Sequence, residues 1–340
     1  MGRKARTVNK SKAVKFLEKL APLLALAILI VIMSLLTPQF ATVNNGMNIL
    51  RQTAVNGFLA TGMLLTLITA GIDLSVGTNA ILSACAMAFL MVTFGISSPI
   101  VLLLTALLVG TLVGVVNGLL LTKLKLPHPF VSTLGMKYVL AGLALYLLAT
   151  RTISGFDEGV TFLGSADLFK GGGFNGIPLS FLAMLVLFVF VHLLLNRTAL
   201  GRSIYAVGGN PEATRLSGIN TDRVLTFVYG AAGFCSALAG IVIVGRSGVA
   251  NPSAGMSGNY ETDAIAACII GGASFTGGKG TIWGTLIGAL IISVIRNGLT
   301  LMNAQSDVQF MVIGSVIIVA VFVDVRRNAS EEKRRRLAAA

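Results

Sequence analysis

The sequence predicts an all-α polytopic membrane protein with about ten transmembrane helices. Of its 340 residues, 55% are hydrophobic and only 11% are charged, and the mean hydropathy is +0.86. Apolar stretches long enough for a span of about 20 residues recur along the chain. The net charge of +13 would suggest nucleic acid in a soluble protein, but its basic residues gather beside the first and last spans. We therefore expect a membrane surface, and no nucleic acid, as the partner of these charges.

The predicted spans lie at residues 20–36, 53–70, 76–94, 99–121, 129–149, 178–195, 224–245, 263–276, 282–301 and 308–324. They form one transmembrane domain, 20–324, between a basic N-terminal tail, 1–19, and a basic C-terminal tail, 325–340. The positive-inside rule puts both tails in the cytoplasm, which requires an even number of spans. The first span has a longer apolar core than a secretory signal and no clear cleavage site before Asn44, so we expect a retained anchor.

The cysteines and histidines indicate neither disulfides nor a metal site. All three cysteines fall inside predicted spans, where small packing residues are expected, and the two histidines stand alone. These residues are Cys85, Cys235, Cys268, His128 and His192.

Two short matching segments suggest an internal repeat. Asn117-Gly118-Leu119 ends the fourth predicted span at the inner face, and Asn297-Gly298-Leu299 ends the ninth at the outer face. Opposite orientation is what an inverted-topology repeat requires, with spans two to five matching spans seven to ten. Three shared residues also arise by chance, so this alternative stays open. Gly110 and Gly114, four residues apart, predict a close approach of two helices.

Two long polar segments are expected on the outer face, at residues 150–178 and 246–262. Segments of this length are usually either functional or loosely ordered. One interpretation is a pair of flexible connectors, and the other is a docking surface for an extracytoplasmic partner.

Acidic residues mark two expected helix starts. Asp73 and Ser75 lie in Gly71–Gly77 (GIDLSVG), and Glu261 and Asp263 stand at the entry to the eighth predicted span. An ionised carboxylate at bilayer depth costs about 2.5 to 3.5 kcal/mol on insertion scales, so each needs a partner, a wet cavity or a helix end. A helix cap explains these residues in one interpretation. In the other they line a translocation path or gate.

The glycine-rich run at residues 271–281 is not a phosphate-binding loop. Ala273 stands where such a loop needs its first glycine, and Gly280 stands where it needs Ser or Thr after Lys279. A broken or re-entrant helix near the inner face fits better. We find no catalytic residues, no cofactor site and no means of capturing chemical energy, so an enzyme is not expected. The lack of an acid–histidine relay argues against proton coupling, although Asp73 and Lys137 keep that option open.

An inner polar segment, residues 196–222, contains a short helix in its middle. Asn210 can cap it, Pro211 suits its first position, and Gly218 can end it in the left-handed conformation. A small preformed helix on the inner face suggests a docking point for another protein.

Several ordered motifs together resemble one family. The sequence is similar to the membrane permeases of bacterial ATP-binding-cassette (ABC) importers for monosaccharides, and most similar to the ribose permease family. The resemblance covers about residues 24–324. It rests on Thr37–Phe40 with Asn48–Leu50, on Gly71–Gly77, on Leu200–Asn220, on Tyr260–Ile291 and on Asn297–Leu299.

The resemblance implies the partners and the site residues. Such permeases form the pore as two copies in the bacterial inner membrane, with cytoplasmic ATPases that use the ATP and a periplasmic or lipid-anchored sugar-binding protein. Their short coupling helix carries Glu-Ala-Ala followed by Gly, and here Thr214 replaces the second Ala on a helix expected to be exposed. The implied ATPase-coupling helix comprises Asn210, Pro211, Glu212, Ala213, Arg215 and Gly218.

We therefore expect a pore for a monosaccharide, ribose or a related sugar, that rocks between outward and inward access as the ATPases close. Its sugar contacts should be weak, because few polar or aromatic residues fall inside the spans. Candidates for the path or gate are Asp73, Ser75, Asn117, Glu261, Asp263 and Asn297. The alternatives are an ion- or proton-coupled secondary transporter, or an ABC permease for another sugar or a branched-chain amino acid.

Overall fold

The computed structural model describes residues 22–126, 128–171 and 176–339, and it confirms the predicted all-α class. The predicted tail 1–19 lies outside these ranges. After a first helix, Pro22–Leu36, the helices are α2 (Val43–Ile68), α3 (Val76–Phe94), α4 (Pro99–Thr122), α5 (Pro129–Leu147), α6 (Glu158–Ser165), α7 (Leu179–Arg197), α8 (Ala199–Gly209), α9 (Pro211–Leu216), α10 (Thr221–Ser247), α11 (Ala254–Ser257), α12 (Tyr260–Ile270), α13 (Ile282–Leu301) and α14 (Ser306–Ala339). The strands are β1 (Ile153–Ser154), β2 (Asp167–Leu168), β3 (Ile177–Pro178) and β4 (Val249–Ala250).

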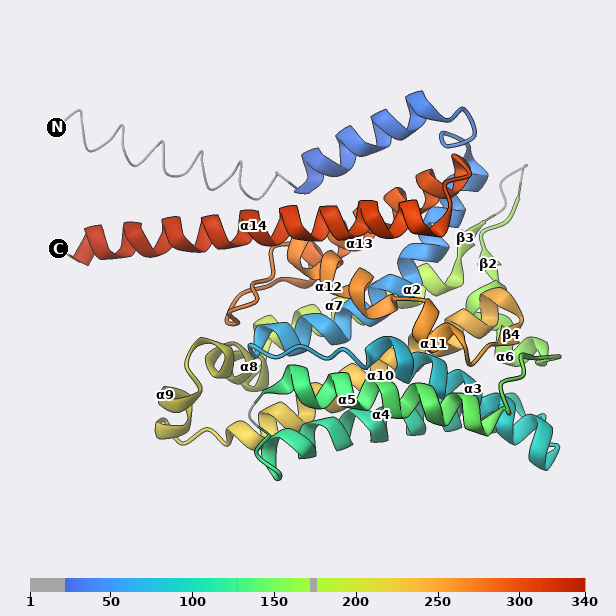
Figure 1. The fold of residues 1–340 in the computed structure, drawn as a ribbon, viewed down its shortest axis with the longest axis horizontal. Helices are drawn as coiled ribbons and strands as arrows, with labels where there is room; N and C mark the ends of the chain where they lie inside the picture. The colour runs from blue at the N-terminus through green and yellow to red at the C-terminus, as the bar shows by residue number, and fades with distance from the viewer. Residues whose placement is uncertain (1–21, 127, 172–175, 340) are drawn as a thin grey trace.

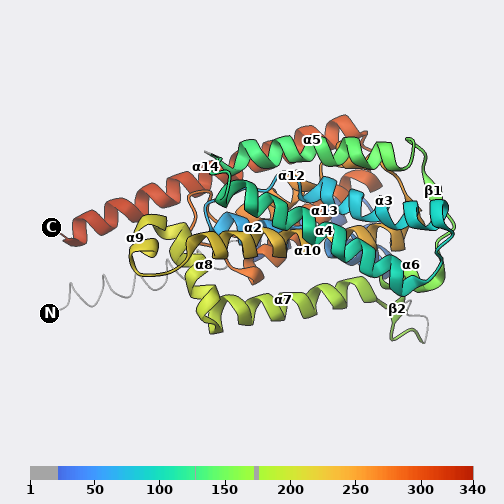
Figure 2. The same ribbon diagram turned by 90° about the horizontal axis from the view of Figure 1, so that it is seen from below.

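The bundle has two distinct ends (Figures 1 and 2). Helices α8 and α9 lie at one end, which we call the α9 end, and the C-terminal end of α14 points the same way. Helix α6 and the strands lie at the other, which we call the hairpin end. Helix α14 continues to Ala339, so residues 325–339 of the predicted C-terminal tail are helical.

Seven helices in the described part of the chain are long and apolar enough to cross a bilayer, so the prediction of ten spans is not confirmed. They are α3, α4, α5, α7, α10, α13 and the first part of α14. The difference lies in three elements: Pro22–Leu36 and α12 are too short, and α2 carries many polar residues. The predicted eighth span, 263–276, is an 11-residue helix that ends at Ile270.

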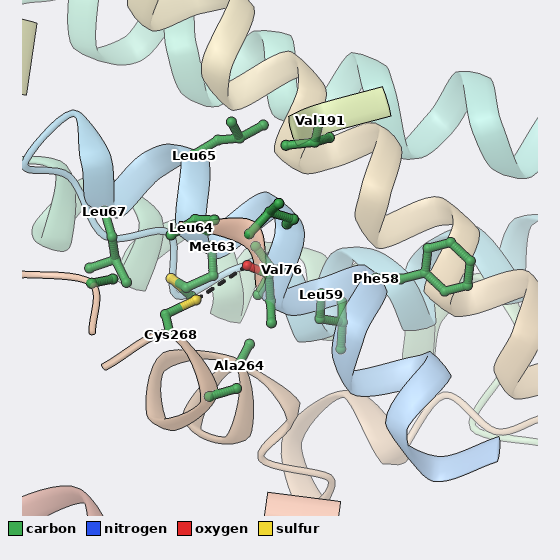
Figure 3. Packing of buried hydrophobic residues seen from close by; sticks show 14 of the residues in the cluster. Phe58, Leu59, Met63, Leu64, Leu65, Leu67, Val76, Val191, Ala264 and Cys268 are labelled. Carbon is green, nitrogen blue, oxygen red and sulfur yellow. Dashed lines mark hydrogen bonds between the residues drawn. The ribbon is translucent and has the colours of Figure 1, made fainter. Parts of the chain in front are cut away.

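Helix α2 is the centre of the bundle. Every residue from 53 to 68 is buried, although the segment includes Thr53, Asn56 and Thr61. Helices α7, α10, α12 and α13 all pack against it. Figure 3 shows Leu65 of α2 beside Val191 of α7, and the Cys268 thiol of α12 donates a hydrogen bond to the Ala60 carbonyl. The low hydropathy of α2 is tolerated because other helices, and not lipid, surround it.

Helices α4 and α10 form the most extensive contact, and glycines make it close. A Cβ atom on Gly114 would lie 2.2 Å from the Tyr229 carbonyl oxygen, and one on Gly233 would lie 2.2 Å from that of Gly110. The predicted packing role of Gly110 and Gly114 is confirmed.

The described residues of the two outer segments pair with one another and with the bundle. Strand β1 of the first pairs with β4 of the second, with Ile153 opposite Ala250. Strands β2 and β3 pair within the first segment, and α6 packs on α10. Arg51 of α2 donates to both carboxylate oxygens of Asp167 at 2.7 Å, which ties the hairpin to the bundle.

We predict that Gly114→Ala destabilises the bundle by about 1–3 kcal/mol, because the new methyl group overpacks the α4–α10 contact. Unfolding of the purified protein in detergent would measure the change. Gly142→Ala in α5 is the matched control, since nothing lies within 4 Å of its Cβ position. Equal stability of the two variants would contradict the assigned contact.

Candidate functional site

Two helices begin inside the bundle and meet there. Helix α3 follows the unwound segment 69–75, and α12 follows α11. A Cβ atom on Gly77 would lie 2.8 Å from Glu261 Oε2 and 3.0 Å from Tyr260 Cβ, so the first turns of α3 and α12 are in contact. Discontinuous helices whose N-terminal ends face one another in the middle of a bundle are a usual place for a transport site. We call this contact the paired helix starts.

Asp73, Ser75 and Asn117 form one buried chain of hydrogen bonds at the start of α3. Asp73 Oδ1 accepts from the Ser75 backbone N–H at 2.9 Å and from the Ser75 hydroxyl at 2.6 Å. Asn117 Nδ2 of α4 donates to Ser75 Oγ at 2.8 Å. Ser75 occupies the cap position, but its side chain accepts no N–H from the first turn of α3. Asp73 therefore orders the unwound segment and Asn117 fixes it to α4.

Thr133 of α5 holds the same segment from the other side. Its hydroxyl donates to the Ile72 carbonyl at 3.0 Å and accepts from the Leu74 N–H at 3.2 Å. Non-helical backbone at membrane depth needs such internal partners.

The acids of α12 are both in ion pairs. The Lys137 ammonium of α5 lies 2.5 Å from Glu261 Oε1, with the two side chains only 15% and 4% exposed. Arg296 of α13 donates to both carboxylate oxygens of Asp263, at 2.5 and 2.8 Å. As predicted, both acids lie in the first turn of the helix. The lysine within a predicted span is thus explained by a buried carboxylate.

Asn297 lies apart from the paired helix starts. It exchanges two hydrogen bonds of 2.9 Å with Asn45 at the start of α2, near the hairpin end. Asn117 and Asn297 therefore contact different elements, and the inverted repeat stays a prediction.

The predicted short helix is confirmed as α9. Asn210 Oδ1 accepts from the Ala213 N–H at 3.0 Å, Pro211 is in the first turn, and Gly218 has φ +82°. Glu212 and Arg215 form an exposed ion pair at 2.8 Å. The hydrogen bond to Glu212 raises the pKa of the Arg215 guanidinium, so Arg215 stays charged at neutral pH.

One expectation about α9 is wrong. Thr214 is buried, because its hydroxyl donates to the Asn210 carbonyl at 2.7 Å and its side chain faces the protein. The other residues from 211 to 218 are exposed, and Leu216 is 79% exposed. An isolated six-residue helix with an exposed leucine is a surface that suits a partner protein.

Helix α8 carries α9 and packs against the centre of the bundle. A Cβ atom on Gly208 would lie 1.7 Å from the Ile68 carbonyl oxygen, at the end of α2. The same carbonyl accepts from the Gly278 N–H at 2.8 Å, and Tyr205 donates to the Gly280 carbonyl at 2.7 Å. Helix α8, the end of α2 and the glycine-rich turn after α12 are thus joined at the α9 end.

A family model described as branched-chain amino acid transport system / permease component matches residues 45–321. The chain belongs to this permease family. The ribose import permease protein RbsC of Bacillus subtilis is 42% identical over 313 residues, covering 92% of this chain and 94% of the relative. The Escherichia coli D-allose transport system permease protein AlsC is 37% identical over 311 residues, covering 91% and 92%. No solved structure matches significantly.

Membership makes this permease a transport component and a multi-pass protein of the bacterial inner membrane. Among the described residues, no group of three His, Cys, Asp or Glu side chains could hold a metal ion.

Sequence reasoning missed several residues of the site. The sequence suggests for Lys137 only a possible part in proton coupling, and it gives no sign of the ion pair that Arg296 forms. Thr133 and Asn45 carried no signal, because threonine and asparagine are common in such chains. Their roles depend on helix packing that brings together residues up to 252 positions apart. Helix α8 was read as part of a polar loop.

We predict that Lys137→Met lowers the free energy of unfolding by about 3–5 kcal/mol, because Glu261 is left buried without its counterion. The double variant Lys137→Met, Glu261→Gln should recover most of this loss. Thermal unfolding in detergent would measure both. If the double variant were as unstable as the single one, the two side chains would not be coupled.

Proposed function

We propose that this permease is the membrane-spanning subunit of an ABC importer that takes up a monosaccharide, ribose or a closely related sugar. It works as two copies, with cytoplasmic ATPases at the α9 end and a sugar-binding protein at the hairpin end. The chain itself needs no cofactor, and ATP is used by the partner subunit. Curated relatives named as ribose, D-allose, fructose and galactose permeases support a sugar over an amino acid.

The observation that best supports the proposal is the way in which α9 is attached to the bundle. The helix presents Glu212, Arg215 and Leu216 to solvent, while buried Thr214 fixes its inner side. Partner docking therefore acts on a small rigid element, which transmits displacement better than a loop.

The next step of the coupling runs through α8. Because Gly208 contacts the Ile68 carbonyl directly, a shift of α8 moves the end of α2. The unwound segment 69–75 comes directly after α2 in the chain, and it holds Asp73 at the start of α3. Motion at the ATPase is thereby brought to the middle of the bundle.

The hairpin end supplies the second docking surface. The paired strands β1 and β4 join both outer segments, and the Arg51–Asp167 ion pair fixes the hairpin to α2. A binding protein that docks there contacts the same central helix from the opposite side.

We predict that Glu212→Arg reduces copurification of the ATPase and sugar-stimulated ATP hydrolysis by at least about tenfold, because it reverses a charge on the exposed face of α9. For copurification of the ATPase, Glu158→Arg is the matched control, since Glu158 is also an exposed first-turn residue, in α6 at the end of the bundle away from α9. ATPase binding unchanged in Glu212→Arg would refute the docking role of α9.

We predict that Gly208→Ala impairs transport about tenfold or more while the ATPase still binds, because its methyl group would separate α8 from the end of α2. The neighbouring Gly209→Ala should transport normally, since nothing lies within 4 Å of its Cβ position. Transport and ATPase binding would be measured in proteoliposomes that contain the whole complex. Normal transport by Gly208→Ala would exclude this coupling route.

The energy source distinguishes the proposal from a secondary transporter. The complete complex should accumulate ribose only with ATP. Uptake by the purified permease alone, driven by an imposed proton or sodium gradient, would overturn the proposed function.

A further inference from the structure

A polar cavity of about 270 Å³ lies in the half of the bundle nearer the hairpin end. Helix α2 contributes Gln52, Asn56 and Leu59, which share one helix face at i, i+4 and i+7. Helix α13 contributes Ser293 and Arg296 from the opposite side. Tyr260 and Asp263 of α12 complete the wall.

Asn56 is the least satisfied residue of this cavity. Its side chain is buried, and neither its amide nitrogen nor its amide oxygen has a hydrogen-bond partner among the described residues. The side-chain oxygen of Gln52, one turn away, also lacks one. Buried amides are normally hydrogen-bonded, so these atoms point to a ligand or water that completes them. Together the two amides offer both donors and acceptors.

Most of the charged side chains in the cavity wall are paired with each other. Asp263 and Arg296 hold a two-pronged ion pair, and neither is left to bind a small ion of its own. Arg246, at the end of α10, is exposed and lies at the outer rim. Apolar Val55, Leu59 and Ile292 fill the rest of the wall. Such a lining suits a neutral molecule that carries several hydroxyl groups and an apolar C–H face.

The volume limits the size of that molecule. Since a water molecule takes about 30 Å³ of liquid volume, the cavity has room for a ligand of about ten non-hydrogen atoms. One pentose or hexose ring fits, whereas a disaccharide does not.

The cavity also leads to the paired helix starts. Asp263 belongs both to its wall and to the first turn of α12, whose neighbour Glu261 contacts α3. A molecule in the cavity would therefore contact α12, the helix whose first turn touches α3.

We propose that this cavity is the outward-facing site where the permease receives a single neutral monosaccharide, and that Asn56 is its central hydrogen-bonding residue. This inference rests on the function proposed above and adds the residues that meet the sugar. The small number of polar groups agrees with weak binding, which allows release toward the inner side.

Uptake of ribose by the reconstituted complex tests the role of Asn56. Asn56→Leu should lower the rate about tenfold at subsaturating ribose, because it removes up to three hydrogen bonds at similar volume. Ser293→Ala, a milder change, should lower it about threefold. Thr53→Val is the matched control on α2, since Thr53 bonds only its own helix and does not line the cavity. Copurification of the ATPase verifies folding of each variant.

Protection from labelling tests occupancy directly and does not depend on transport. Ser293 lines the cavity, whereas the three native cysteines are buried elsewhere, so Ser293→Cys should be the main site for a small water-soluble thiol reagent. Ribose should slow its labelling, and inorganic phosphate should not. Protection by phosphate alone would overturn the assignment of a neutral ligand.

The outcomes separate this inference from the proposed function. If the wild-type complex imported no sugar with ATP, the proposed function would fail. If it imported ribose while Asn56→Leu and Ser293→Ala matched the wild-type rate, and ribose gave no protection, only the cavity assignment would fail.

Discussion

The backbone of segment 69–75 must find all its hydrogen bonds inside the protein, because lipid offers none. The structure meets this constraint with groups from four directions. The Gly71 N–H donates back to the Thr66 carbonyl, and the Ile68 carbonyl accepts from Gly278. Thr133 holds Ile72 and Leu74, while Asp73 accepts from Ser75. Two of these partners, Thr133 and Gly278, are distant in the sequence, so the unwound segment depends on correct assembly of the surrounding bundle.

The same contacts connect segment 69–75 to several distant elements. The helix that carries the exposed α9 contacts the last carbonyl of α2, and the glycine-rich turn after α12 contacts the same atom. Only glycine allows these approaches, since a Cβ atom on Gly208 or Gly277 would clash with neighbouring backbone. A displacement at the α9 end therefore cannot be absorbed by side-chain rotation. It must move either α2 or the turn, and both lead to the paired helix starts.

The sequence predicted the features that are encoded locally. The cap and end of α9 follow from Asn210, Pro211 and Gly218, and the start of α12 follows from its first-turn acids. Features that depend on packing were missed. The predicted span 53–70 lies in the polar helix α2, because sequence cannot tell burial by protein from exposure to lipid, and the Lys137–Glu261 pair joins residues 124 positions apart. The count of ten spans is not confirmed, because short helices such as α12 depend on other helices to satisfy their ends.

The pairing of charges bears on the source of energy. Glu261 and Asp263 each hold a cation within hydrogen-bond distance, and Asp73 accepts two hydrogen bonds from Ser75. A proton carrier must gain and lose its proton in each cycle, and protonating Glu261 or Asp263 would leave a buried lysine or arginine without its counterion, which costs about 3–5 kcal/mol for a buried pair. The same pairing leaves the path without a strong net charge to trap or repel a neutral solute. Buried carboxylates that stay in ion pairs suit a pore whose movement is driven from outside the membrane through α9. They suit less well a pore driven by protonation of groups inside the membrane.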